Sequence, residues 1–169
     1  MIDPRQHLVL VGMTGVGKST IARILGVRLG RDVWDTDSAI EERAGRSVRR
    51  IFAEDGEAVF RTLESGVLRD ALASTAPLVI ATGGGIVVAE GNRRLMGESG
   101  ARVVWLCADP ATLVERVANA SHRPLLDDDP AGTLQRMMLD REAFYREVAD
   151  AIVLVDHRSA SEVVEAVLR

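Results

Sequence analysis

An eight-residue segment, Gly12 to Ser19, constrains the fold of this chain more than any other part of its sequence. It reads Gly-Met-Thr-Gly-Val-Gly-Lys-Ser and matches G-x-x-x-x-G-K-[ST], the P-loop that joins a strand to a helix. The apolar run 7–11 precedes it and indicates a buried strand, and apolar residues at helical spacing follow it. The loop therefore lies at a helix N-terminus, where unpaired N–H groups and the helix dipole favour an anion.

The residue types within the loop each have a chemical reason. Lys18 can reach the β- and γ-phosphates of a nucleotide, and the hydroxyl of Ser19 can bind Mg²⁺. Backbone N–H groups cradle phosphate oxygens, and glycines let the backbone approach the anion closely. We therefore predict that a nucleotide binds at six consecutive residues: Gly15, Val16, Gly17, Lys18, Ser19 and Thr20.

The rest of the chain alternates apolar runs with segments of helical character, over a length typical of one domain. The runs predict strands at five places: 7–11, 32–35, 78–81, 103–107 and 151–155. Aromatic residues make up only 4% of the chain and aliphatic residues are common, which suits a parallel sheet covered by helices. We expect an α/β domain whose ligands bind at the carboxyl ends of the strands.

Three short patterns predict where helices begin. Residues 38–41 (Ser-Ala-Ile-Glu) and residues 159–162 (Ser-Ala-Ser-Glu) have the form of a capping box. Asp109 followed by Pro110 provides an N-cap and a proline in the first helical turn. The polar, proline-containing stretch 118–132 is interpreted as a surface flap within one domain.

Composition argues against several classes of protein. The net charge of −4 disfavours non-specific nucleic-acid binding, which needs a basic surface. The single cysteine, Cys107, has no partner for an internal disulfide and lies in an apolar run, so we expect a buried structural thiol. No apolar stretch approaches the roughly 18 residues of a membrane span. The start of the chain lacks the anatomy of a signal peptide, so we predict a cytoplasmic protein.

Two aspartates follow the second predicted strand. In an extended segment, Asp35 and Asp37 would point to the same side. One could hold a metal-bound water, while the other could accept hydrogen bonds from substrate hydroxyls and draw a proton from one of them. The alternative is that Asp37 only caps the next helix. The P-loop favours the functional interpretation, because this strand end faces the phosphate site in such folds.

Three consecutive glycines, Gly83, Gly84 and Gly85, follow the apolar run 78–80. Glycines at the end of a strand permit tight turning and the close approach of a ligand to the backbone. Their N–H groups could donate to a carboxylate or a hydroxyl. A simple turn is the alternative, and a triple glycine alone does not decide between the two.

Four arginines could supply positive charge near these motifs. Arg61 belongs to a helix expected to begin near Glu57, and Arg141 lies on a later helix. Arg116 precedes the flap and Arg123 lies within it. A guanidinium binds a carboxylate with two parallel hydrogen bonds, which lysine cannot imitate. The alternative for each is a solvated surface side chain.

Taken in order, these motifs resemble the shikimate kinase family over essentially the whole chain. The P-loop alone is widespread, whereas the later blocks in this order are far more specific. The motifs are Gly-Met-Thr-Gly-Val-Gly-Lys-Ser-Thr at 12–20, Asp-Thr-Asp at 35–37, Ile-Phe-Ala-Glu-Asp-Gly-Glu-Ala-Val-Phe-Arg at 51–61 with Glu64, Gly-Gly-Gly at 83–85, Arg-Pro-Leu-Leu at 123–126 and Arg-Glu-Ala-Phe-Tyr-Arg at 141–146.

The resemblance implies a three-layer P-loop kinase fold in a single domain, 1–169. The implied sheet has five parallel strands in the order 2-3-1-4-5 and is flanked by helices. The implied parts are a core (1–37, 71–117 and 131–169), a substrate-binding helical pair (about 38–70) and a mobile lid (about 118–130).

The resemblance also implies a reaction. ATP, with Mg²⁺ as cofactor, would phosphorylate the 3-hydroxyl of shikimate and give shikimate 3-phosphate and ADP, a step of the chorismate route to aromatic amino acids. Asp37 would hold the ring hydroxyls and act as a base or only orient one of them, and Arg61 and Arg141 would clamp the carboxylate. The remaining substrate contacts implied are Phe52, Phe60, Glu64, Gly83, Gly84 and Gly85.

On the nucleotide side, Lys18 and Arg123 would neutralise charge on the transferred phosphoryl group. Ser19 would bind Mg²⁺ directly and Asp35 through water, while Arg116 would stack against adenine. The segment after the last strand, 156–161, is shorter than the adenine loop usual in the family, which leaves Arg158 as a weaker candidate for a nucleotide contact. We expect a monomer.

Other functions remain open at this stage. A related kinase for another polyol acid, such as gluconate, would share the P-loop but would not need the Arg61 and Arg141 pair. A regulator that binds metabolites without turnover would be expected to lack Lys18, Asp37 or Arg123, and all three are present. A GTPase should carry an [NT]-K-x-D motif, and the chain has none.

Overall fold

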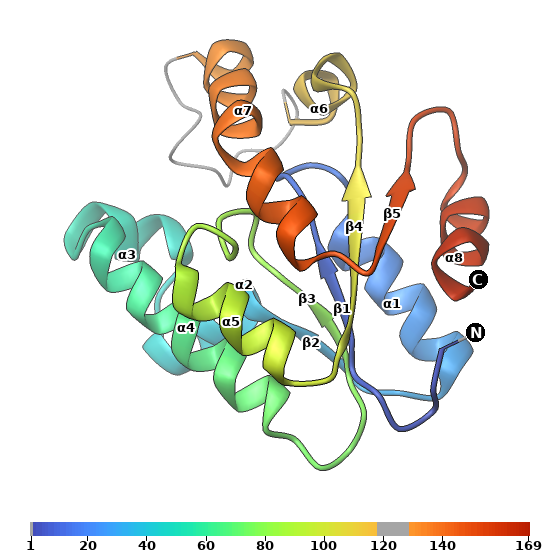
Figure 1. Cartoon of the computed structure of the whole chain (residues 1–169). Helices are drawn as coiled ribbons and strands as arrows, with labels where there is room; N and C mark the ends of the chain where they lie inside the picture. The colour runs from blue at the N-terminus through green and yellow to red at the C-terminus, as the bar shows by residue number, and fades with distance from the viewer. Residues whose placement is uncertain (1, 118–128) are drawn as a thin grey trace.

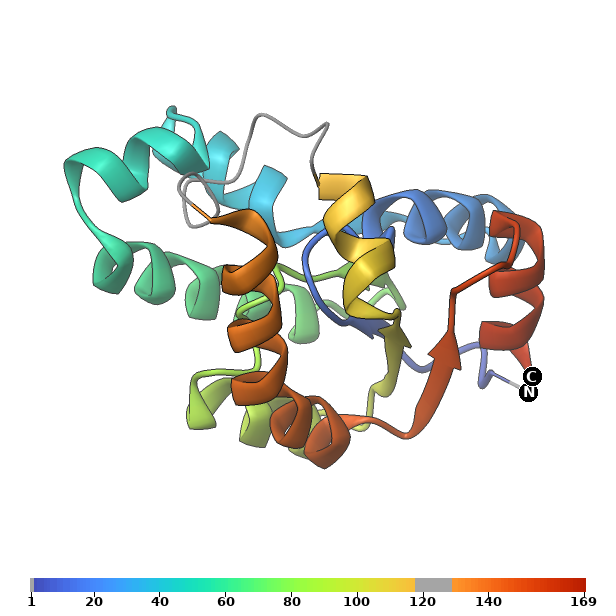
Figure 2. The same ribbon diagram turned by 90° about the horizontal axis from the view of Figure 1, so that it is seen from above.

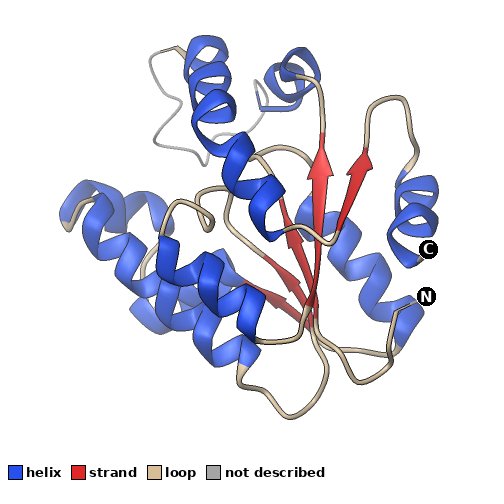
Figure 3. Ribbon diagram, viewed as in Figure 1, coloured by secondary structure: helices blue, strands red, loops and turns tan. Residues whose placement is uncertain are grey.

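The computed structural model describes residues 2–117 and 129–169 and contains one parallel sheet (Figures 1 and 3). Its strand order is β2-β3-β1-β4-β5, with every pairing parallel, as predicted. The strands match the predicted runs to within one residue at each end: β1 Leu8–Val11, β2 Val33–Asp35, β3 Val79–Ala81, β4 Arg102–Cys107 and β5 Ala151–Leu154.

Helices cover both faces of this sheet and give the expected three layers. In Figure 1, α1 and α8 lie against one face, and α4, α5 and α7 lie against the other. The view from above places α3 and α8 at opposite ends of the molecule (Figure 2). The helices of the described residues are α1 Lys18–Leu29, α2 Thr36–Ala44, α3 Val48–Glu54, α4 Glu57–Leu72, α5 Glu90–Glu98, α6 Pro110–Val117, α7 Pro130–Val148 and α8 Ala160–Leu168.

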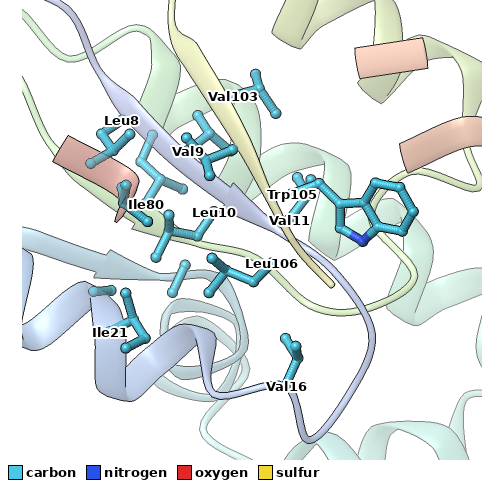
Figure 4. Packing of buried hydrophobic residues seen from close by; sticks show 14 of the residues in the cluster. Leu8, Val9, Leu10, Val11, Val16, Ile21, Ile80, Val103, Trp105 and Leu106 are labelled. Atoms are coloured by element: carbon cyan, nitrogen blue, oxygen red, sulfur yellow. The ribbon is translucent and has the colours of Figure 1, made fainter. Parts of the chain in front are cut away.

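The main core is centred on β1, whose four side chains are 0% exposed. Side chains from neighbouring strands and from α1 pack around them, including Ile80, Leu106 and Ile21 (Figure 4). A strand covered on both faces is a continuous apolar run, because neither face meets water. This burial fixes the end of β1, from which the P-loop departs.

A second, smaller hydrophobic cluster lies in the region expected to bind substrate, and it corrects one prediction. The cluster consists of Ile40, Ile51, Phe60 and Val67, contributed by α2, α3 and α4. The region is therefore built from three helices rather than a helical pair. Gly45 (φ 64°) separates α2 from α3 and Gly56 (φ 86°) separates α3 from α4, and both have positive φ angles that favour glycine.

The start of α2 also differs from prediction. The helix begins at Thr36, and Asp35 is its N-cap rather than Ser38. The Asp35 carboxylate accepts hydrogen bonds from the N–H groups of Asp37 (3.1 Å) and Ser38 (3.2 Å). A carboxylate at the end of the strand can satisfy these amides and favours the positive end of the helix dipole, so the helix starts before the predicted capping box.

The other two helix starts are confirmed. The Asp109 carboxylate accepts a hydrogen bond from the N–H of Ala111 (3.0 Å) at the beginning of α6. At α8, the Ser159 hydroxyl accepts from the Glu162 N–H and the Glu162 carboxylate accepts from the Ser159 N–H, which completes a capping box.

Cys107, at the end of β4, is more exposed than expected, because it is half-buried rather than buried. Partial burial and the nearby carboxylates of Asp156 and Glu142 raise the pKa of its thiol. A thiol that stays protonated is a poor nucleophile, so the expected structural role agrees with its surroundings. Within residues 2–117 and 129–169, no helix is long and apolar enough to cross a membrane.

We predict that Ser159→Ala lowers the free energy of unfolding by about 1 kcal/mol, because α8 loses the side-chain half of its capping box. Urea unfolding followed by circular dichroism measures the change. Ser161→Ala is the matched control, since Ser161 is an exposed serine in the first turn of the same helix. Equal stability of the two variants would contradict a stabilising role for the box.

Candidate active site

A polar pocket of about 220 Å³ lies where the P-loop meets the ends of β2 and β3. This is the edge of the sheet at which the sequence predicted a site. Eleven residues line the pocket, and they combine the P-loop, both aspartates and part of the glycine triplet: Thr14, Gly15, Gly17, Lys18, Ser19, Thr20, Asp35, Asp37, Thr82, Gly83 and Gly84.

The P-loop has the backbone conformation that its glycines predict. Gly12, Gly15 and Gly17 have φ angles of 141°, 81° and 101°, which are unfavourable for residues with a side chain. A Cβ atom on Gly12 would lie 2.3 Å from the carbonyl oxygen of Leu106. Val16 is buried, so it can offer the pocket only its backbone.

Lys18 is folded against this loop and is only 7% exposed. Its Nζ donates hydrogen bonds to the carbonyl oxygens of Gly12 (2.6 Å) and Met13 (2.8 Å). These contacts hold an ammonium group at the wall of the pocket, close to the amides at the start of α1. Positive charge and backbone donors therefore converge at the place expected for phosphates.

Ser19 and Asp35, the two residues predicted for magnesium, are in direct contact. The Ser19 hydroxyl donates to Oδ2 of Asp35 over 2.6 Å, and both residues line the pocket. Mg²⁺ is usually held by one or two protein oxygens, with waters and phosphates completing its octahedron. The donor set of Ser19 and Asp35 fits this pattern.

Asp37 also lines the pocket, but not because it shares one side of an extended strand with Asp35, as predicted. Asp35 ends a strand and Asp37 lies in the first turn of α2, so the two do not share one extended segment. The alternative in which Asp37 serves as the N-cap is wrong, because Asp35 fills that role. The turn of the helix, rather than strand alternation, brings both carboxylates to one pocket.

Next to Asp37, Arg61 forms an ion-pair network on α4. Its Nη1 donates to Glu64 (2.8 Å), while Nε and Nη2 donate to the same oxygen of Glu57 (3.2 and 3.0 Å). The side chain of Arg61 is 19% exposed and that of Glu64 is 1% exposed. Arg61 is therefore a partly buried cation held by two ion pairs, and not the solvated surface arginine of the alternative.

Burial raises the pKa of the Glu64 carboxyl, and the charge of Asp37 adds to this effect. Arg61 and Arg141 act in the opposite direction. The second oxygen of Glu64, Oε1, is buried and has no hydrogen-bond partner among the described residues. A buried acceptor without a donor is costly, so a hydroxyl or water donor at this position would be favourable.

The glycine triplet is explained by close contacts and not by unusual backbone angles. A Cβ atom on Gly83 would lie 2.6 Å from Oε1 of Glu64 and 3.0 Å from Oδ1 of Asp37. A Cβ on Gly85 would lie 2.2 Å from Nη1 of Arg61. Glycine leaves room for these charged groups at the end of β3, which favours the functional interpretation of the triplet over a simple turn.

Two aromatic rings stand beside this network. Phe52 on α3 and Phe60 on α4 have ring centroids 4.6 Å apart. The guanidinium of Arg61 lies 5.3 Å from the centre of the Phe60 ring, within the range of a cation–π contact. Phe60 belongs to the smaller hydrophobic cluster and Phe52 packs against it, so both rings support the helix that carries Arg61.

The remaining predicted residues differ in where the structure places them. The charge of half-buried Arg141, on α7, acts on the Glu64 carboxyl, so the acceptor-side arginines belong to one electrostatic group. Arg116 reaches the P-loop, where its Nη1 donates to the Val16 carbonyl (3.3 Å). Arg158 is exposed and does not line the pocket. Arg123, and all of the predicted lid but its last two residues, lie outside the described residues.

Sequence reasoning missed Tyr145, and also Thr14 and Thr82, which line the pocket. Tyr145 on α7 is 0% exposed, and its hydroxyl donates to the carbonyl oxygen of Gly84. In the sequence this residue stands out only as part of the motif at 141–146, with no role attached to it. A tyrosine among apolar residues in a predicted core helix was the available signal, because a buried hydroxyl requires a partner.

Comparisons with known proteins agree with this geometry. The model of the shikimate kinase family matches residues 14–169. The shikimate kinase of Pseudomonas paraeruginosa is 42% identical over 163 residues, covering 96% of this chain and 94% of its own. A shikimate kinase from Acinetobacter baumannii, solved in complex with shikimate, superimposes with a TM-score of 0.92 at 34% identity, covering 96% of this chain and 90% of its own.

A gluconokinase from Sinorhizobium meliloti is more distant. Its TM-score is 0.63 at 18% identity, with 99% of this chain and 91% of its own covered, so it shares the fold alone. The family model and the 42% identical relative both span nearly the full length of this chain. The chain therefore belongs to the shikimate kinase family, whose members are ATP-dependent phosphotransferases.

Proposed function

We propose that the chain phosphorylates the 3-hydroxyl of shikimate with ATP and releases shikimate 3-phosphate and ADP. One observation carries this proposal: the P-loop and the carboxylate of Asp37 line the same pocket. A phosphate donor bound at one wall and a hydroxyl bound at the other would meet there. The product would serve the chorismate route to aromatic amino acids.

On the donor side, the protein supplies position and charge. Phosphoryl transfer passes through a loose transition state, so catalysis consists mainly of alignment and charge stabilisation. The P-loop amides and Lys18 would bind the phosphates, with Lys18 held in place by the Gly12 and Met13 carbonyls. Ser19 and Asp35 would hold Mg²⁺, which supplies further charge neutralisation when bound.

On the acceptor side, Asp37 would accept a hydrogen bond from the hydroxyl that attacks. Its place in the first turn of α2, against Gly83, fixes the carboxylate at the pocket. Such a bond turns a lone pair of the hydroxyl oxygen toward the phosphate. A carboxylate in this position can also take up the proton as the new bond forms.

The acid group of the substrate would be recognised by the two arginines, Arg61 and Arg141. Arg61 is preorganised by Glu57 and Glu64, so little conformational entropy is lost when it binds a carboxylate. Arg141 lies close enough to influence the same Glu64 carboxyl. Phe52 and Phe60 would flank the ring of the substrate.

Three further arginines complete the proposed site. Arg123 would stabilise the moving phosphoryl group when a lid over 118–130 closes. Arg116 is proposed to contact adenine, which its position beside the P-loop backbone supports. Arg158 is kept only as a weaker candidate for the same role. A cytoplasmic location and a monomeric state are also part of the proposal.

The function is tested by an ADP-release assay with a panel of hydroxylated acids, with and without Mg²⁺. We expect release that requires both Mg²⁺ and shikimate, with phosphate found on the 3-hydroxyl by nuclear magnetic resonance. Gluconate, the nearest alternative acceptor, should give no more than background release. Turnover of gluconate but not shikimate would overturn the proposal.

We predict that Asp37→Asn lowers kcat by at least about 100-fold while ATP binding changes little, because the amide cannot take up a proton and donates where the carboxylate accepts. Steady-state kinetics and nucleotide titration measure the two effects. Asp70→Asn is the matched control, since Asp70 forms an exposed ion pair with Arg43 on the same group of helices. Unchanged turnover in Asp37→Asn would remove this residue from the acceptor site.

We predict that Gly85→Ala raises the KM for shikimate more than it lowers kcat. The new methyl group would fall on the guanidinium of Arg61, which can move aside because it is the end of a long side chain. Arg61→Lys should act in the same direction, since lysine cannot form two parallel hydrogen bonds. Gly97→Ala, at a helical position with open space, is the control. An unaltered KM in both test variants would show that Arg61 does not bind the substrate.

A further inference from the structure

Tyr145 connects α7 to the walls of the pocket. Its side chain is completely buried, and its hydroxyl donates to the carbonyl oxygen of Gly84. The same hydroxyl lies 3.7 Å from Sδ of Met13, in the P-loop. Its ring stacks on Trp105 of β4, with ring centroids 5.5 Å apart. The stacking on Trp105 therefore holds the ring against the sheet, and the hydroxyl contacts both the glycine triplet and the P-loop.

Gly84, which receives this hydrogen bond, packs against the P-loop. A Cβ atom on Gly84 would lie 3.0 Å from the backbone nitrogen of Thr14 and 3.5 Å from the carbonyl carbon of Met13. Its two neighbours face the acceptor side, because Gly83 packs against Asp37 and Gly85 packs against Arg61. The triplet is thus the piece of backbone that separates the donor wall of the pocket from the acceptor wall.

A hydrogen bond to the Gly84 carbonyl fixes more than one atom. The peptide between Gly84 and Gly85 is planar and trans, so its C=O and N–H point in opposite directions. When the carbonyl is held in place, the direction of the Gly85 N–H is therefore fixed as well. Glycines lack the side-chain restraints that would otherwise limit rotation of this peptide. Tyr145 supplies the restraint from outside the triplet. Burial raises the pKa of its hydroxyl well above the usual value, so the group remains a donor.

We propose that Tyr145 is a positioning residue for phosphoryl transfer, acting through Gly84 to set the distance between the acceptor hydroxyl and the phosphate bound at the P-loop. The proposal rests on the function proposed above. Arg141 lies one turn earlier on α7, and its charge acts on the Tyr145 hydroxyl. The helix that would bind the acid group of the substrate is therefore fastened to the backbone between the two walls.

The alternative is that Tyr145 only fills the core. A packing residue affects stability, and it affects catalysis only to the extent that the fold is weakened. A positioning residue affects the step that depends on alignment, so kcat falls and water competes for the phosphoryl group. The ratio of ADP released to shikimate phosphorylated distinguishes the two roles, because stability alone does not change it.

The test compares Tyr145→Phe with Phe144→Leu. Tyr145→Phe keeps the ring on Trp105 and removes only the hydroxyl. Phe144, the preceding residue of α7, packs on the core under the guanidinium of Arg93 (4.2 Å) and makes no hydrogen bond to the triplet, so Phe144→Leu weakens the same helix. Thermal unfolding places the two variants on one stability scale.

We expect Tyr145→Phe to lower kcat about ten-fold and to release more than one ADP for each shikimate phosphorylated. Phe144→Leu should keep a ratio of one and a kcat near that of the unchanged protein. Equal kinetics in the two variants would overturn the positioning role and leave the proposed function intact. Failure of the unchanged protein to phosphorylate shikimate would instead overturn both.

Discussion

The site depends on a strand that has no solvent-facing side. All four side chains of β1 are fully buried, so the point at which the chain leaves the sheet is fixed by packing on both faces. The P-loop begins at that point and ends at α1, whose first amides have no partners within the helix. Because this apolar strand is rigid, the backbone donors of the P-loop, Lys18 and Ser19 are held in fixed positions.

The acceptor wall is built at an energetic cost. Glu64 is buried beside Asp37, and burial raises its pKa. A carboxyl whose pKa is raised on folding destabilises the folded state once the pH exceeds its unfolded value, and this cost disappears below that value. Arg61 offsets part of the cost through a 2.8 Å contact. The same contact holds the guanidinium of Arg61 against Gly85 at the end of β3.

Much of this arrangement was predictable from the sequence, because the signals were local. The P-loop, the five apolar runs and the Ser159 capping box each depend on neighbours along the chain, and each is confirmed. The predicted start of α2 was wrong because two residues, Asp35 and Ser38, could each cap this helix. In the structure, the carboxylate of Asp35 at the end of β2 caps the helix, and the hydroxyl of Ser38 does not.

The contacts that the sequence left open are those between distant segments. Nothing near Gly85 indicates that Arg61 will lie on it, since the two residues are on different elements and meet only after the sheet has formed. The role of Tyr145 was missed for the same reason, because its partner Gly84 lies on a distant segment. Glu57 is different, since it pairs with Arg61 one turn away on the same helix, a spacing that the sequence already contains. Periodicity shows that a residue faces the core, but it does not show which atom in the core the side chain will meet.

The contacts of Gly85 with Arg61 and of Tyr145 with Gly84 lie near the boundary between the two hydrophobic clusters. The donor wall belongs to the main core around β1, whereas Phe60 and the helices near it form a separate small cluster. Helix α4 links the two clusters, because its Leu68 and Ala71 lie in the main core and its Phe60 and Val67 lie in the small one. The glycine triplet crosses this boundary, touching Thr14 on one side and Arg61 on the other, and Tyr145 holds its central carbonyl. At the pocket itself, this short backbone segment and the hydroxyl that fixes it join the donor wall to the acceptor wall.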